Sequence, residues 1–202
     1  VEKGLDFLKR LDKLSKTELI HSREEISTIT VLNGVASYTG GTTGASLKVV
    51  YRRDDLQERF AYLDEFRALH GYELGLRVAW FSGKELINAR DIGKNVFYKT
   101  DFINKIRFYS TFHITEKTAV YYAKTLSEFN CKYIVGFPSS ISRICKYCEA
   151  LGISFDGRID VFFPTAETVT QEHRDVISRF FGCKVVDQYA SSEGAPFIFE
   201  CS

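Results

Sequence analysis

Five short runs rich in β-branched and aromatic residues constrain the fold of this chain more than any other feature. They read LRVAWF, KIRFYS, KYIVGF, IDVFF and KVVDQY, at residues 76–81, 105–110, 132–137, 159–163 and 184–189. Helical patterns separate the later runs, and strands that alternate with helices are typical of βαβ units. We therefore expect an α/β fold in which a mainly parallel sheet is flanked by helices.

Helix start and stop signals support this alternation. A polar, partly helical lead-in is expected over 12–25, and the acidic pair Asp54 and Asp55 opens a helix over 53–69 that Gly71 stops. Threonine or serine caps and terminal glycines bound three further helices: Thr115 before 116–129, Ser139 before 140–151 and Gly152, and Thr170 before 171–181 and Gly182.

Parallel strands joined by right-handed crossovers deliver their following loops to one edge of the sheet. These loops are FPSS at 137–140, PTAET at 164–168 and YASSEG at 189–194, with STFHIT at 110–115 beside them. Ligands of open α/β sheets bind at this carboxyl edge. Most of the loops are rich in small or hydroxyl residues, so we expect a polar ligand.

Charge and composition exclude several classes of partner. The 27 basic residues nearly balance the 26 acidic ones, so the overall charge does not favour nucleic acid or an anionic membrane as the main partner, although a local basic patch is compatible with it. No stretch approaches the roughly 20 apolar residues of a membrane span, and the first residues lack a signal-peptide core. The expectation is a cytoplasmic protein, with an oligomeric state that the sequence leaves open.

The five cysteines fit reduced thiols better than disulfides, because their number is odd and the chain is too large to need crosslinks. Cys145 and Cys148 form a CxxC that suggests zinc or redox chemistry. They also share a helix face with Ile141 and Ile144, and no second CxxC exists. We therefore predict that they are packed core thiols.

The segment SYTGGTTGASLKVV, residues 37–50, is a candidate phosphate loop. Residues 36–38 and 48–51 are expected to be extended, so 39–46 would form a tight loop between two strands. Glycines let backbone N–H groups approach a ligand, and the hydroxyls add donors. The alternative is a polar hairpin whose glycines serve only the turn, since neither a Walker loop nor GxGxxG is present.

Three blocks in order carry a family resemblance: YTGGTTGASLKVVYR, YIVGFPSSI at 133–141, and 165–194 from TAETVT to SSEG. They resemble adenylate-forming enzymes, most closely the branch of phenylacetate-CoA ligases and the CapK-type proteins of bacterial capsular polysaccharide clusters. The resemblance covers about 12–201 and implies that 1–202 is part of the large N-terminal AMP-binding domain. It also implies that the C-terminal domain with the catalytic lysine lies beyond residue 202, which would leave this chain catalytically incomplete.

The resemblance further implies a nucleotide site with bound Mg²⁺. The loop residues would cradle the β- and γ-phosphates of ATP: Thr39, Gly40, Gly41, Thr42, Thr43 and Gly44. Ala166 and Glu167 would line the adenine and ribose side, whereas Tyr189 would pack on the adenine and Ser192 would contact phosphate. Gln188 and Ser191 are further ATP-binding candidates, and Glu193 would help to hold Mg²⁺.

The implied reaction is activation of a small carboxylate as its acyl-adenylate, with coenzyme A as a candidate acceptor. We expect His113, Phe137 and Pro138 to line the substrate pocket, although His113 fits a structural role at the start of the next helix equally well. Ala45 and Ser46 stand where the family usually has lysine and proline, and Ala190 replaces a glycine. These departures support an alternative: a non-catalytic nucleotide-binding or assembly module of capsular polysaccharide biosynthesis.

Overall fold

The computed structural model describes residues 6, 9–38, 47–191, 194 and 197–201. It divides into two compact units. The first contains the described residues up to Arg59 together with Gly194, and the second contains Phe60 to Ser191 and 197–201. Within the described part of the chain, no helix combines the length and the apolar character that crossing a membrane requires.

The first unit holds a helical lead-in and one strand pair. Short helices α2 (Lys16–His21), α3 (Arg23–Ile26) and η1 (Val31–Asn33) precede β1 (Val35–Tyr38), which pairs antiparallel with β2 (Lys48–Tyr51). Tyr38 lies opposite Lys48, so the two ends of the glycine segment are neighbours. The predicted lead-in and the two predicted strands are confirmed, whereas the loop 39–46 lies outside the described residues.

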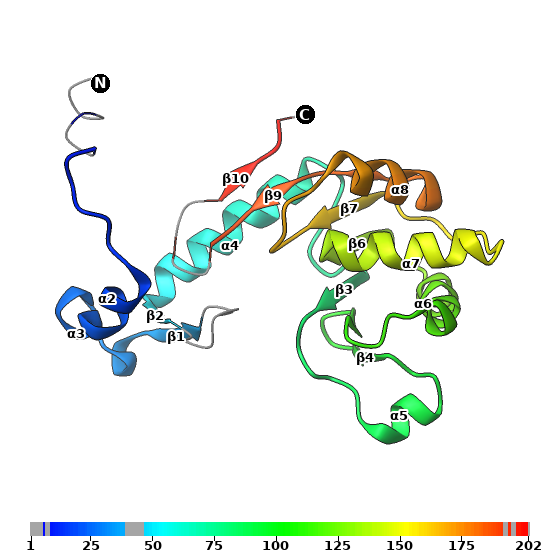
Figure 1. Cartoon of the computed structure of the whole chain (residues 1–202), viewed down its shortest axis with the longest axis horizontal. Helices are drawn as coiled ribbons and strands as arrows, with labels where there is room; N and C mark the ends of the chain where they lie inside the picture. Colours follow the sequence, from blue (N-terminus) through cyan, green and yellow to red (C-terminus); the bar gives the residue numbers. More distant parts are fainter. Residues whose placement is uncertain (1–5, 7–8, 39–46, 192–193, 195–196, 202) are drawn as a thin grey trace. The chain divides into compact units, whose positions relative to one another are not determined.

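The second unit is built on a six-stranded sheet with the order β4-β5-β3-β6-β7-β8. Figure 1 labels β4, β3, β6 and β7 of this sheet. The strands are β3 (Val78–Ser82), β4 (Tyr98–Asp101), β5 (Ile106–Ser110), β6 (Tyr133–Gly136), β7 (Val161–Pro164) and β8 (Lys184–Val185). Every neighbouring pair is parallel except β4 and β5, which are antiparallel. The expected α/β fold with a mainly parallel sheet is confirmed.

Local signals set most helix boundaries. Helix α4 (Arg53–Ala68) forms where it was expected, and capping boxes at Thr115 and Thr170 begin α6 (Glu116–Phe129) and α8 (Gln171–Phe181). Gly182 ends α8 in the left-handed conformation. The expected cap at Ser139 is wrong, because α7 (Pro138–Ala150) begins two residues earlier, with Phe137 as the N-cap residue and proline at its first position.

Two features of the second unit differ from the sequence expectation. The run 184–189 is not one strand: β8 ends at Val185, and β9 (Gln188–Tyr189) instead pairs antiparallel with β10 (Ile198–Phe199). Glu200 links the same two segments, because its carboxylate accepts a hydrogen bond from the Asp187 amide at 2.8 Å. The short helix α5 (Ala89–Gly93) and the edge strand β4 were not expected.

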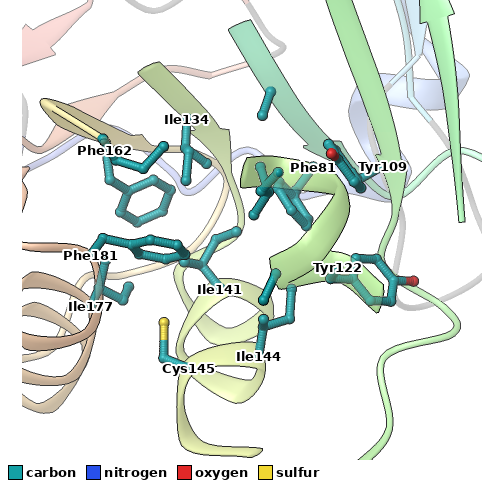
Figure 2. Close-up of a cluster of buried hydrophobic side chains, with 14 of the residues drawn as sticks. Phe81, Tyr109, Tyr122, Ile134, Ile141, Ile144, Cys145, Phe162, Ile177 and Phe181 are labelled. Atoms are coloured by element: carbon teal, nitrogen blue, oxygen red, sulfur yellow. The ribbon is translucent and has the colours of Figure 1, made fainter. Parts of the chain in front are cut away.

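Helices α6, α7 and α8 cover one face of the sheet and enclose the larger core (Figures 1 and 2). Figure 2 shows Ile141, Ile144 and Cys145 of α7 directed toward Phe162 and Ile134 of the sheet and toward Ile177 and Phe181 of α8. Burying each large apolar side chain stabilises the fold by roughly 1.5–3 kcal/mol. Cys145 and Cys148 are fully buried free thiols, which confirms them as core residues.

The other face of the sheet carries a smaller aromatic core. Phe66, from the second half of α4, stacks on Phe199 with 4.0 Å between ring centroids and meets Phe163 edge-on at 6.4 Å. Val135, Val161 and Tyr133 complete this layer. The sheet is therefore covered on both faces. This leaves the two ends of its strands for polar groups: the carboxyl edge, where the parallel strands end, and the opposite edge, where they begin.

Candidate nucleotide site at the carboxyl edge of the sheet

The register of the sheet places the ends of four strands side by side. Ser82 of β3 lies opposite Ser110 of β5, Phe81 lies opposite Gly136 of β6, and Gly136 lies opposite Pro164 of β7. The loops that follow these strands therefore start at one edge of the sheet. This confirms the sequence expectation for the segments 110–115, 137–140 and 164–168.

Gly136 allows the closest of these strand contacts. A Cβ atom at this position would lie 2.5 Å from Phe81 Cβ and 2.8 Å from the Phe81 carbonyl oxygen, so any side chain would force the strands apart. The next residue, Phe137, is half-buried and its ring lies against the backbone of Gly83. Pro138 is buried at the start of α7. Phe137 is thus the apolar residue of this pair that is partly exposed at the carboxyl edge, whereas Pro138, expected to line the substrate pocket, is covered by its neighbours.

Glu167 closes the amino end of α7 in place of a local cap. Its carboxylate accepts one hydrogen bond from the Ser139 amide at 3.0 Å and another from the Ser139 hydroxyl at 2.9 Å. Ala166 adopts a left-handed conformation, with φ of 63°, and the Thr165 amide donates to the Gly136 carbonyl at 2.9 Å. This turn presents Ala166 and Glu167, both exposed, beside the end of β6.

Two predicted nucleotide contacts in the segment after β8, Tyr189 and Gln188, differ in how far they are exposed. Tyr189 is 57% exposed, as a ring that stacks on a ligand requires, whereas Gln188 is only 8% exposed. Gln188 directs its amide inward, where Oε1 accepts a hydrogen bond from Arg67 Nε at 3.3 Å. Ser191 is half-buried at the end of this segment.

Arg67 is a residue that the sequence did not single out. It belongs to α4, is only 7% exposed, and holds its guanidinium 5.5 Å from the Phe163 ring centroid and 6.0 Å from that of Trp80. Burial lowers the pKa of Arg67, and the pKa of nearby Asp64 is raised by its own burial although Arg67 opposes this shift. A helical pattern alone cannot identify such a residue, because its partner lies 121 positions away.

His113 lies at the carboxyl edge, as expected, and is fixed by its neighbours. Its Nδ1 lies 3.0 Å from the Ser110 hydroxyl, and its ring stacks on Phe97 with 5.8 Å between centroids. The Thr118 hydroxyl donates to the His113 carbonyl at the start of α6. These contacts account for a structural role, and they leave the ring half-buried beside the exposed Phe112.

Several predicted site residues lie outside the described part of the chain. They are the six loop residues 39–44 together with Ser192 and Glu193, the expected magnesium ligand. Among the described residues, no group of three or more His, Cys, Asp or Glu side chains is placed to hold a metal ion. The described carboxyl edge therefore offers the turn at Ala166 and Glu167 and the apolar ring of Phe137, and the expected magnesium ligand lies outside the described residues.

The comparisons with known proteins agree with this fold. Protein CapK from Staphylococcus aureus is 31% identical over 193 residues, which is 96% of this chain and 43% of the relative. A 2-hydroxyisobutyryl-CoA ligase in complex with 2-HIB-AMP and CoA matches 90% of this chain and 43% of its own, with a TM-score of 0.60 and 12% identity. No protein-family model matches the chain.

The chain is similar to CapK and has the adenylate-forming fold. A long-chain-fatty-acid-CoA ligase from Archaeoglobus fulgidus, at a TM-score of 0.55 and 13% identity, shares this fold over 78% of the chain and 31% of its own length. So does an anthranilate CoA ligase in complex with anthranoyl-AMP, at 0.51 and 14%, over 82% of the chain and 30% of its own length. The chain spans about two fifths of CapK, and its adenylate-forming fold corresponds to the N-terminal domain of such enzymes.

Proposed function

We propose that this chain supplies the nucleotide-binding part of a ligase that activates a small carboxylate as its acyl-adenylate with ATP and Mg²⁺. The observation that carries the proposal is the gathering at the carboxyl edge of 110–115, 137–140 and 164–168, in a chain similar to CapK. The relatives with bound acyl-AMP support the same chemistry by likeness of fold.

The proposed site residues would act mainly by positioning and charge neutralisation. Attack of a carboxylate oxygen on the α-phosphorus forms the acyl phosphate bond and expels pyrophosphate. Donors of the 39–44 loop would hold the β- and γ-phosphates, Tyr189 would pack on adenine, and Glu193 would help to bind Mg²⁺, which neutralises the charge that develops on the leaving group. Phe137 would shield the carboxylate from water.

Binding of ATP to the chain itself is the first test. We expect calorimetric titration to show Mg²⁺-dependent binding that Glu193→Gln weakens by at least about tenfold, the loss that one removed charge-assisted contact produces. Glu128→Gln is the matched control, because Glu128 is an exposed carboxylate at the far end of α6. Equal ATP affinity in the chain and both variants would contradict the proposed role of Glu193.

Turnover separates the ligase from the non-catalytic alternative, which the substitutions Ala45, Ser46 and Ala190 favour. Pyrophosphate exchange is measured on a longer parent protein with a library of small carboxylates. Exchange that requires Glu193 supports the ligase, with transfer to coenzyme A tested by thioester formation. ATP binding without exchange for every carboxylate supports a nucleotide-binding or assembly module.

A further inference from the structure

A cavity lies at the opposite edge of the sheet, and four of the twelve residues that line it are cationic. Its volume is about 600 Å³, and it is bounded by Arg77, Lys105 and Lys132, which immediately precede β3, β5 and β6, and by Arg107 of β5. These residues lie at the amino ends of the strands. The five residues of β3 separate this cavity from the carboxyl edge by about 15 Å at the usual strand rise.

Asp101, the acidic residue that lines this cavity, forms its hydrogen bonds within the adjacent turn. Both oxygens of Asp101 accept hydrogen bonds within the β4–β5 turn, from the amides of Ile103 and Asn104 at 3.0 Å and from Asn104 Nδ2 at 2.7 Å. These bonds hold the pKa of Asp101 below its usual value. Asp101 therefore stays charged, but its lone pairs serve the turn rather than the cations.

Within the described residues, the four cations form few ion pairs with carboxylates. Asp160 is the one carboxylate that pairs with any of the four, at 3.8 Å from Lys132, and it lies closer to Arg158, at 2.6 Å. No ion pair in the described chain involves Arg77, Lys105 or Arg107. The balanced charge of the whole sequence thus conceals a local excess of positive charge at this edge.

The two guanidinium groups are held in place before any ligand binds. Arg107 donates to the Thr125 carbonyl at 2.7 Å and to the Thr100 hydroxyl at 3.2 Å, and it lies over the rings of Tyr98 and Phe129 at 4.2 and 4.3 Å. Arg77 donates to the Phe129 carbonyl at 3.1 Å. These contacts use one donor of Arg77 and two of Arg107, and a guanidinium has five. The remaining donors suit the oxygens of an anion.

We propose that this cavity binds a phosphomonoester attached to an apolar group. The phosphate would lie among Arg77, Lys105, Arg107 and Lys132, because guanidinium and ammonium donors match its oxygens. The apolar group would pack on Phe102, which lines the same cavity and is 86% exposed at the β4–β5 turn. A lipid headgroup and a soluble organic phosphate share this chemistry.

Titration with hexyl phosphate tests the proposal, with hexanol and inorganic phosphate as partial probes. We expect hexyl phosphate to bind more tightly than either partial probe and to shift the amide NMR signals of Asn104, Lys105 and Lys132. Saturation with ATP and Mg²⁺ should not displace it, because the nucleotide site is proposed for the other edge. Shifts confined to the carboxyl edge, or competition with ATP, would overturn the assignment.

A double variant, Lys105→Asn with Lys132→Gln, removes two exposed cations without disturbing the core. Asparagine suits position 105, where φ is 55°. We expect hexyl phosphate to bind at least about tenfold more weakly to this variant, with the melting temperature retained. Lys117→Gln, at an exposed lysine in the first turn of α6, controls for the loss of a single surface charge and should bind as the parent does. Unchanged affinity in the double variant would refute the site.

Vesicles distinguish the two sources of the phosphate. Co-sedimentation with phosphatidic acid in phosphatidylcholine, lost in the double variant and absent with phosphatidylcholine alone, identifies a lipid headgroup. Hexyl phosphate binding without vesicle capture identifies a soluble phosphomonoester. Both results support the cavity as a phosphate site, and absence of binding to either probe contradicts it.

Discussion

Arg67 and Gln188 are joined by a buried hydrogen bond that ties helix α4 to the segment carrying Tyr189. The bond runs from Arg67 Nε to Gln188 Oε1 at 3.3 Å, with both residues less than a tenth exposed. Because Gln188 and Tyr189 are consecutive in β9, the arginine holds the backbone from which the exposed tyrosine projects. Arg67 is therefore a structural partner of the segment that carries Tyr189.

A double-mutant cycle measures this interaction. Arg67→Met should cost about 1–3 kcal/mol because it leaves the Gln188 amide buried without its partner, and Gln188→Leu should cost about 3 kcal/mol because it leaves Arg67 Nε buried without its acceptor. The double variant pairs two apolar groups, so its loss should fall short of the sum by at least about 1 kcal/mol. Urea unfolding gives all three values. Strictly additive losses would show that the two residues are not coupled.

Gly136 should tolerate no side chain. Gly136→Ala places a Cβ atom against the Cβ atom and the backbone of Phe81, which cannot move aside as a flexible side chain would. We therefore expect the free energy of unfolding to fall by at least about 3 kcal/mol, or the chain to fail to fold. Gly93→Ala is the matched control, because a Cβ atom there meets nothing within 4 Å at the end of α5. That variant should change stability by less than about 1 kcal/mol in thermal or urea unfolding. Similar losses in the two variants would contradict the packing described for β6.

Thiol reactivity should divide the cysteines sharply. Cys201 is exposed, whereas Cys131, Cys145, Cys148 and Cys183 are buried. Burial raises the pKa of Cys148 and of Cys131 to about 11 and that of Cys183 to about 12, so these thiols stay protonated and unreactive near neutral pH. Ellman's reagent should titrate one thiol in the folded chain and all five in denaturant. Fast reaction of a second thiol in the folded chain would contradict the burial.

Glu200 should make part of the stability depend on pH. Hydrogen bonds from the Asp187 amide and then from Arg174 lower the pKa of Glu200 from its ordinary value of 4.5. Its contribution is therefore complete above that value and disappears as the pH falls through the lowered pKa. Because the side chain is 40% exposed, solvent screening limits the effect to less than about 1 kcal/mol.

The measurement compares the parent with Glu200→Gln by urea unfolding at pH about 7 and about 3.5. At pH about 7 the parent should have a larger free energy of unfolding than Glu200→Gln, and the difference between the two proteins should be smaller at pH about 3.5. Glu128→Gln removes an exposed carboxylate of α6, outside β9 and β10, so it controls for general charge effects. A gap that widens on acidification would contradict the assigned sign.

The sequence predicted those elements whose signals are local. Thr115 and Thr170 lie next to the helices they cap, so α6 and α8 have the expected bounds. The cap of α7 could not be predicted, because its acceptor is Glu167, 28 residues from Ser139. Edge strand β4 was missed because its short segment, YKTD, is defined by pairing with β5 rather than by a pattern of its own.

For the candidate site, the sequence predicted which loops lie together but not the direction of each side chain. Right-handed crossovers fix which loops share an edge, so the neighbourhood of His113, Phe137 and Glu167 followed from strand order alone. The direction of a side chain depends on its tertiary partner. Gln188 was expected to face a nucleotide and instead bonds to Arg67, which no spacing rule relates to it. The cationic cavity was missed for the same reason, since its residues come from separate strands.

The two edges of this sheet draw on separate parts of each strand connection: one on residues that follow strands, the other on residues that precede them. A substitution that alters Lys105 or Lys132 therefore leaves every residue of the carboxyl edge unchanged. Random mutagenesis under selection can therefore change the affinity at one edge while the residues of the other edge stay the same. A sheet of this kind lets one protein evolve two independent specificities.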